Sequence, residues 1–176
     1  VIGAFTATAT KQVKQDIVSL LKLIEPVAIT TGFDRKNLYF GVEISKNKSK
    51  ELLSLLRKYK DRSGIVYCIS RKLVEQVCDE LCDAGFAATR YHAGLSPEER
   101  ASNQQDFIYD RRNIMVATNA FGMGIDKHNV SFVIHYNMPK DIESYYQEAG
   151  RAGRDGEPAD CILLYSGKDV RTNQFL

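Results

Sequence analysis

A short segment rich in glycine and arginine carries the residue types that suit phosphate chemistry. Gln147, Arg151 and Arg154 are spaced four and three residues apart, so a continuing helix would place them on one face. Gly150 and Gly153 remove side-chain bulk between the guanidinium groups, which would let another surface approach the backbone. Two forked, permanently charged donors suit a triphosphate whose γ-phosphoryl group gains charge during transfer, and such an arginine finger contributes roughly 10³ to 10⁵ in rate. The alternative is a solvated turn at the end of a helix.

A second segment, residues 114–126, is typical of a strand that runs into a Gly-x-Gly loop and ends at a carboxylate. Thr118 follows the strand, where a hydroxyl and nearby N–H groups could hold a backbone phosphate. Asp126 could accept a hydrogen bond from a ribose hydroxyl, or orient an arginine finger. The alternative is a tight turn whose glycines provide positive φ, with Asp126 capping the next element.

A third segment combines a histidine with a helix start. Ser96 at the cap, Pro97 at the first helical position and Glu99 in a capping box mark the start of this helix. The free N–H groups and the positive dipole end that follow Gly94 suit a phosphate. His92 could add a donor. The simpler interpretation is a well-capped helix start with His92 merely exposed.

Two more predicted strand ends carry hydroxyl groups. The apolar strand at residues 64–69 is followed by Ser70, Arg71 and a second cation, a phosphate site of a kind that is common on α/β surfaces. Thr6 and Thr8 lie in a small-residue strand end near the start of the chain, for which the alternative is a helix-capping turn.

The elements that must position these segments alternate between strand and helix. Apolar runs predict strands at residues 1–5, 27–31, 38–45, 64–69, 88–91, 114–117, 131–136 and 161–165. Amphipathic patterns and caps predict helices at residues 10–22, 49–59, 71–84 and 141–149, with others beginning at 96 and near 167. This order predicts an α/β fold with a parallel sheet covered on both faces. Ligands gather at the carboxyl ends of such strands, which is where the segments above begin.

Length and composition set wide limits. At 176 residues the chain is long enough for one domain with a real core and marginal for two. Hydrophobic residues make up 44% and charged residues 26%, as in ordinary globular proteins. The formal net charge of +2 neither indicates nor excludes a nucleic-acid partner, because a basic groove can lie on a nearly neutral domain. No apolar run approaches the length of a membrane span, so we expect no membrane partner.

The cysteines argue against a metal site. Cys68, Cys78, Cys82 and Cys161 include no Cys-x-x-Cys pair, so a closed zinc site is not expected. We expect them to be small core residues of a reduced, intracellular protein.

Taken in order, the segments resemble the later motifs of superfamily 2 helicases. Residues 5–9 resemble motif III, 64–72 motif IV, 91–95 the segment after it, 116–126 motif V and 146–156 motif VI. Within them, the stretches 120–126, 133–139 and 142–148 are closest to the RecQ family of DNA helicases. DEAD-box RNA helicases instead place His where Gln147 stands. His128 departs from the pattern, because relatives usually carry Pro there.

This resemblance implies a RecA-like second helicase lobe that takes part in ATP-driven 3′ to 5′ unwinding of DNA, in recombination, repair or replication. Arg151 and Arg154 would reach the ATP of the facing lobe, with Gln147 in the same motif and Arg154 as the finger. Gly124 and Asp126 would lie near the ribose and the finger. The residues expected along the DNA track are Ser70, Arg71, His92, Gly94, Thr118 and Asn119. Thr6 and Thr8 would couple the two lobes.

Two parts of an ATPase are missing from the sequence. It contains no Gly-x-x-x-x-Gly-Lys-Ser/Thr loop and no Asp-Glu-x-His motif, so the phosphate cradle and the Mg²⁺ carboxylate would belong to the first lobe. We expect residues 1–31 to be the last strand and helix of that lobe, 32–166 the second lobe, and 167–176 the start of a truncated following element. Zinc is expected only in a downstream domain. The chain alone should then show no measurable ATPase activity.

Two other functions stay open. One is a lobe of an RNA helicase from the same superfamily. The other is a non-catalytic nucleic-acid-binding module, which predicts salt-sensitive binding by this chain but no loss of ATPase activity on Arg154→Ala in the full-length protein. The resemblance implies an intracellular location: cytoplasm or nucleoid in a bacterium, nucleus in a eukaryote.

Overall fold

The computed structural model describes residues 2–6, 10–29, 35–122, 127–167 and 169, and the chain divides into two compact units, Val1–Arg35 and Lys36–Leu176. The smaller unit contains helix α1 (Lys11–Leu20), which begins where Thr10 Oγ1 accepts the N–H of Val13 at 3.2 Å. The strands predicted at 1–5 and 27–31 do not form in their described parts, residues 2–5 and 27–29. Apolar and β-branched residues favour a strand only where a neighbouring strand completes the hydrogen-bond ladder, and the described residues of this unit supply none.

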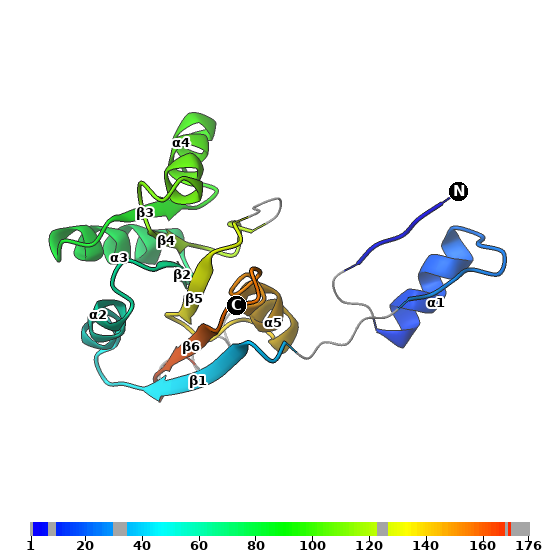
Figure 1. Cartoon of the computed structure of the whole chain (residues 1–176), viewed down its shortest axis with the longest axis horizontal. Coiled ribbons are helices and arrows are strands. Elements are labelled where there is room, and N and C mark those ends of the chain that lie inside the picture. The colour runs from blue at the N-terminus through cyan, green and yellow to red at the C-terminus, as the bar shows by residue number, and fades with distance from the viewer. Residues whose placement is uncertain (1, 7–9, 30–34, 123–126, 168, 170–176) are drawn as a thin grey trace. The chain divides into compact units, whose positions relative to one another are not determined.

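The larger unit is an α/β domain, as predicted. Its described residues form a six-stranded sheet in which every pairing is parallel, in the order β1-β6-β5-β2-β4-β3, and the labels in Figure 1 follow this order. The strands are β1 (Leu38–Ile44), β2 (Ser63–Tyr67), β3 (Ala88–Tyr91), β4 (Ile114–Ala117), β5 (Val130–His135) and β6 (Ala159–Tyr165). Their bounds lie within two residues of the predicted ones.

Helices cover both faces of this sheet. Ile114 and Val116 of β4 pack in one core cluster with buried residues of α2 (Lys48–Lys58) and α3 (Arg71–Asp83). Met115, which points the other way, packs with Phe107 of α4 (Pro97–Ile108) and Ala149 of α5 (Ile142–Ala149). Successive residues of a strand face opposite sides, so an apolar run such as that of β4 must be buried on both.

The cysteine prediction is confirmed at three positions and wrong at one. Cys68, Cys78 and Cys161 are buried, and burial raises the pKa of the Cys78 thiol to about 12. Cys82 is exposed, because the buried face of α3 runs through Val74, Val77, Cys78 and Leu81, and Cys82 lies past the edge of that face. None of the helices in the described residues is both long and apolar enough to cross a membrane.

A buried ion pair ties the start of α2 to the segment after β6. Lys48 Nζ lies 2.6 Å from Asp169 Oδ2 and donates to Tyr136 O at 2.7 Å, while the two side chains are only 10% and 6% exposed. The main-chain N–H of Ser166 donates to the same carboxylate at 2.7 Å. Burial alone would raise the pKa of Asp169, but the hydrogen bonds from Lys48 and Ser166 outweigh it and hold the pKa below its ordinary 3.8.

This pair predicts an acid-sensitive contribution to stability. Because the folded-state pKa of Asp169 is lowered, the contribution is present above the unfolded pKa and lost as the pH falls below about 4. Asp169→Asn should lower the free energy of unfolding at pH 7 by about 3 kcal/mol, since it leaves a buried Lys48 without its counter-ion. The difference from wild type should shrink between pH 5 and pH 3 in urea titrations followed by circular dichroism.

Asp83→Asn is the matched control, because Asp83 is an exposed aspartate at the end of α3. It should leave stability unchanged at every pH. A difference between wild type and Asp169→Asn that stays constant from pH 7 to pH 3 would contradict the role given to the ion pair.

Candidate functional site

Three adjacent strands end together at one edge of the sheet. Ala117, the last residue of β4, is in register with Tyr67 of β2 and Tyr91 of β3. The segments that follow these strands therefore leave the sheet side by side. They carry the residues predicted to bind nucleic acid, namely Ser70, Arg71, His92, Gly94, Thr118 and Asn119.

The segment after β2 contains the N-terminal end of helix α3. Ser70 is the N-cap of α3, and its hydroxyl oxygen accepts the N–H of Leu73 at 3.3 Å. Arg71, the first residue of the helix, is exposed. A capped helix start with a cation beside it is an environment that stabilises an anion.

His92, after β3, is buried rather than exposed. It is 5% exposed, and its Nε2 lies 2.7 Å from Glu75 Oε1. Its Nδ1 accepts the N–H of Gly94 at 3.1 Å, so the ring proton lies on Nε2 and is donated to Glu75. Arg90 holds Glu75 in turn, with Nη1 at 2.6 Å from Oε2. Both ring nitrogens of His92 thus shape the loop at 92–94.

The segment after β4 begins with a tight turn. The main-chain N–H of Thr118 donates to Tyr91 O at 3.2 Å, and its Oγ1 accepts the N–H of Ala120 at 3.4 Å. This leaves the proton of the half-buried Thr118 hydroxyl available as a donor. The neighbouring Asn119 is exposed.

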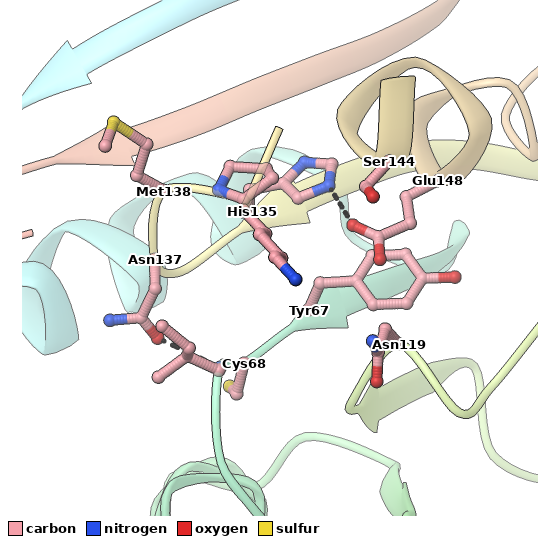
Figure 2. Close-up of a pocket in the computed structure, with 11 residues that line it drawn as sticks. Tyr67, Cys68, Asn119, His135, Asn137, Met138, Ser144 and Glu148 are labelled. Atoms are coloured by element: carbon pink, nitrogen blue, oxygen red, sulfur yellow. Dashed lines mark hydrogen bonds and ion pairs between the residues drawn. The ribbon is translucent and has the colours of Figure 1, made fainter. Parts of the chain in front are cut away.

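A pocket of about 320 Å³ opens between the ends of β2 and β5, next to Asn119 (Figure 2). His135 Nε2 lies 2.9 Å from Glu148 Oε2 of α5, and the His135 ring stacks on Tyr67 with centroids 5.4 Å apart. The chain order reverses here, with β3 and β4 on one side of β2 and β5, β6 and β1 on the other. Ligands of open α/β sheets bind at such a point. Sequence reasoning missed these residues, although a histidine and a tyrosine ending two apolar strands were a usable signal.

The arginine-rich segment forms turns, and the helix before it ends at residue 149, as predicted. Helix α5 ends at Ala149, and Arg151 and Ala152 donate to the carbonyls of Glu148 and Ala149, three residues back. Gln147 lies in the last turn of α5, where its Nε2 donates to Glu143 Oε1 at 3.5 Å. Gln147 and the two arginines therefore do not share one helical face.

The two arginines have different surroundings. Arg151 is half-buried, and its Nη1 donates to Gly122 O at 2.5 Å. Beside it the Tyr67 hydroxyl donates to Phe121 O at 3.0 Å. Burial raises the pKa of Tyr67 well above its ordinary value, although the Arg151 guanidinium opposes this shift. Arg154 is exposed in the following turn. Arg151 thus joins the arginine turn to the turn after β4, while Arg154 is exposed.

Gly153 is required by the turn itself, and the approach of another surface to its backbone stays a prediction. Its φ is +57°, a region that side chains other than glycine rarely adopt. A Cβ added there would lie 2.5 Å from Asn37 Nδ2 and 2.8 Å from Glu157 O. Gly150, at the end of α5, would bring a Cβ within 3.0 Å of Tyr146 O.

Three predicted site residues, Thr8, Gly124 and Asp126, lie outside the described residues, so their roles stay predictions. Thr6 is exposed in the smaller unit. Among the residues that the structure does describe, no group of three or more His, Cys, Asp or Glu could hold a metal ion.

Residues 47–156, which run from the N-cap of α2 through the arginine turn, match the family model described as helicase conserved C-terminal domain. The chain belongs to this helicase family. The chain is 45% identical over 176 residues to the ATP-dependent DNA helicase RecQ of Bacillus subtilis (strain 168), covering 100% of the chain and 30% of that protein. It is 44% identical to the ATP-dependent helicase SGS1 of Saccharomyces cerevisiae over 98% of the chain and 12% of the relative.

A third relative carries a different name. The putative ATP-dependent RNA helicase R290 of Acanthamoeba polyphaga mimivirus is 45% identical over 96% of the chain and 31% of its own length. The chain thus spans about a third or less of the length of each of these three relatives. The predicted resemblance to RecQ-family DNA helicases is confirmed.

Proposed function

We propose that this domain is the second motor lobe of an ATP-dependent 3′ to 5′ DNA helicase, in which it supplies arginines to an ATP held by a facing lobe and part of the single-stranded DNA track. The observation that carries the proposal is the contact between Arg151 and Gly122. It joins the arginine turn to the strand end that bears Thr118 and Asn119, so a change at bound nucleic acid can reach the arginines through directly bonded groups. Motors of this kind need such coupling between the two sites.

Nucleotide contact is assigned to the arginine turn. Arg154, exposed and permanently charged, would stabilise the charge that develops on the γ-phosphoryl group, and Arg151 would support it from its place against Gly122. Gly124 and Asp126 are proposed to lie near the ribose and the finger. ATP supplies the phosphoanhydride bond whose hydrolysis drives translocation. The facing lobe would hold most of the ATP and the Mg²⁺, since this sequence contains no Gly-x-x-x-x-Gly-Lys-Ser/Thr loop and no Asp-Glu-x-His motif.

The DNA track is assigned to the shared edge of β2, β4 and β3. Ser70 and Arg71 at the start of α3, and Thr118 and Asn119 after β4, present donors suited to successive phosphates. His92 has protein partners at both ring nitrogens, so its proposed role is to shape the loop that carries Gly94.

The test compares nucleic acids on the intact protein that contains this chain. ATP hydrolysis should rise at least tenfold with single-stranded DNA and much less with RNA of the same sequence. Duplex DNA with a 3′ tail should be unwound and duplex DNA with a 5′ tail should not. Equal or greater stimulation by RNA would support the RNA-helicase alternative, which the mimivirus relative keeps open. Salt-sensitive binding by this chain, together with ATP hydrolysis by the intact protein that survives Arg154→Ala, would support a non-catalytic binding module.

A further inference from the structure

Asn37 lies just before β1, outside every segment that the sequence analysis singled out. Its side-chain amide binds the arginine turn, which is distant in sequence but adjacent in the fold. Nδ2 donates to Gly153 O and to Glu157 O, both at 2.9 Å. Its own carbonyl accepts the N–H of Ala159 at 2.9 Å, which fixes the Asn37 backbone to the start of β6.

The two carbonyls that Asn37 binds flank Arg154. The turn between them is closed by Gly156, whose N–H donates to Gly153 O at 3.1 Å, and is anchored by Gly153, whose N–H donates to Val130 O at 2.8 Å. One amide nitrogen therefore joins the two ends of the turn that displays Arg154.

Of the residues asparagine, aspartate and alanine, only asparagine can make this contact. Both protons of an amide NH₂ can be donated in one plane, so a single short side chain can serve two carbonyls. Aspartate would place an oxygen against the same two carbonyl oxygens, and alanine would leave the ends of the turn unlinked. For a group that acts on a phosphoryl oxygen, a shift of about 1 Å can cost on the order of a hundredfold in rate.

We propose that Asn37 is a positioning residue for Arg154, which holds the arginine turn in the geometry needed for phosphoryl transfer. The role rests on the proposed function, since it requires Arg154 to act on ATP. Asn37 acts only through the turn and makes no contact with the nucleotide.

The test is a double-mutant cycle in the intact protein, with DNA-stimulated ATP hydrolysis as the readout. Asn37→Ala should lower kcat about tenfold with little change in KM for ATP, because the loss lies in the transition state. When Arg154 is already alanine, Asn37→Ala should cause no further fall, because the residue through which it acts is gone.

Asn103→Ala is the matched control. Asn103 is also half-buried and donates through Nδ2 to a main-chain carbonyl, that of Arg90, at 3.0 Å. It should leave kcat unchanged. Should Asn37→Ala fail to fold, the milder Asn37→Ser is judged by the same criteria. An equal fall in kcat in both Arg154 backgrounds, or an unchanged kcat, would overturn the proposal. A wild-type protein without DNA-stimulated ATPase activity would overturn the proposed function itself, and with it the role of Asn37.

Discussion

Arg154→Ala in the intact protein should lower kcat for DNA-stimulated ATP hydrolysis about a thousandfold, within the range for losing an arginine finger. Arg154 is exposed in its turn, so removing the side chain creates no core cavity and the Arg154→Ala protein should still fold. Single-turnover measurements at saturating ATP would separate this loss of chemistry from weaker binding. Arg154→Lys should recover little activity, because an ammonium group lacks the planar fork of guanidinium.

The control for this prediction is Arg112→Ala. Arg112 is also exposed, but it precedes β4 and so lies at the opposite edge of the sheet from the strand ends described above. It should leave kcat unchanged. An Arg154→Ala protein that keeps full DNA-stimulated ATPase activity would favour the non-catalytic binding module.

Gly122→Ala should lower kcat roughly ten- to a hundredfold while changing stability little. A Cβ at this position would overlap the guanidinium of Arg151. The clash is with the far end of a flexible side chain, so Arg151 can swing away at small cost in folding energy. It would then lose its bond to Gly122 O and its place beside the Tyr67 hydroxyl. ATPase kinetics and thermal unfolding on the same samples would test both halves of this expectation.

The matched control is Gly167→Ala, because a Cβ there would meet nothing within 4 Å. A second arm combines Gly122→Ala with Arg151→Ala. With the guanidinium gone, the added methyl group should have no further effect on kcat. If Gly122→Ala lowers kcat equally in both backgrounds, the glycine acts on something other than Arg151.

Much of the fold could be predicted because local sequence patterns, such as apolar runs and helix caps, determine most of its strands and helices. The run Ile114–Ala117 is apolar at every position, which is typical of a strand covered on both sides, and the Ser96-Pro97 start of α4 is set by its own cap. The strands predicted at residues 1–5 and 27–31 do not form in their described parts, residues 2–5 and 27–29, because a strand also needs a partner, which no local pattern reveals. Cys82 was misplaced for a related reason, since one position beyond the buried stripe of α3 is enough to reach solvent.

The sequence indicated which residue types make up the candidate site, but it did not indicate the different surroundings of each residue. Arg151 and Arg154 are alike in sequence. Their different surroundings arise because α5 ends at Ala149 and because Gly122 and Asn37 come from distant parts of the chain. His92 was predicted as a donor to nucleic acid, but spacing did not reveal that its ring is buried and bonded to Glu75 of the preceding helix. Contacts across such separations depend on the tertiary fold, so spacing alone could not predict them.

The pairing of β1 with β6 has a consequence for how this domain is made. Strand β1 cannot pair until β6, the last strand in the chain order of the sheet, has been made. The hydrogen bonds from Asn37 likewise join residues that are 116 and 120 positions apart in sequence. Contacts of such long range close late in folding, because the entropy of the intervening loop must be overcome first. During synthesis, the central strands can assemble while the arginine turn is still unanchored. The domain would therefore complete its sheet and fix the turn that carries Arg154 in the same final step, so a half-folded domain emerging from the ribosome would not yet present Arg154 in its folded geometry.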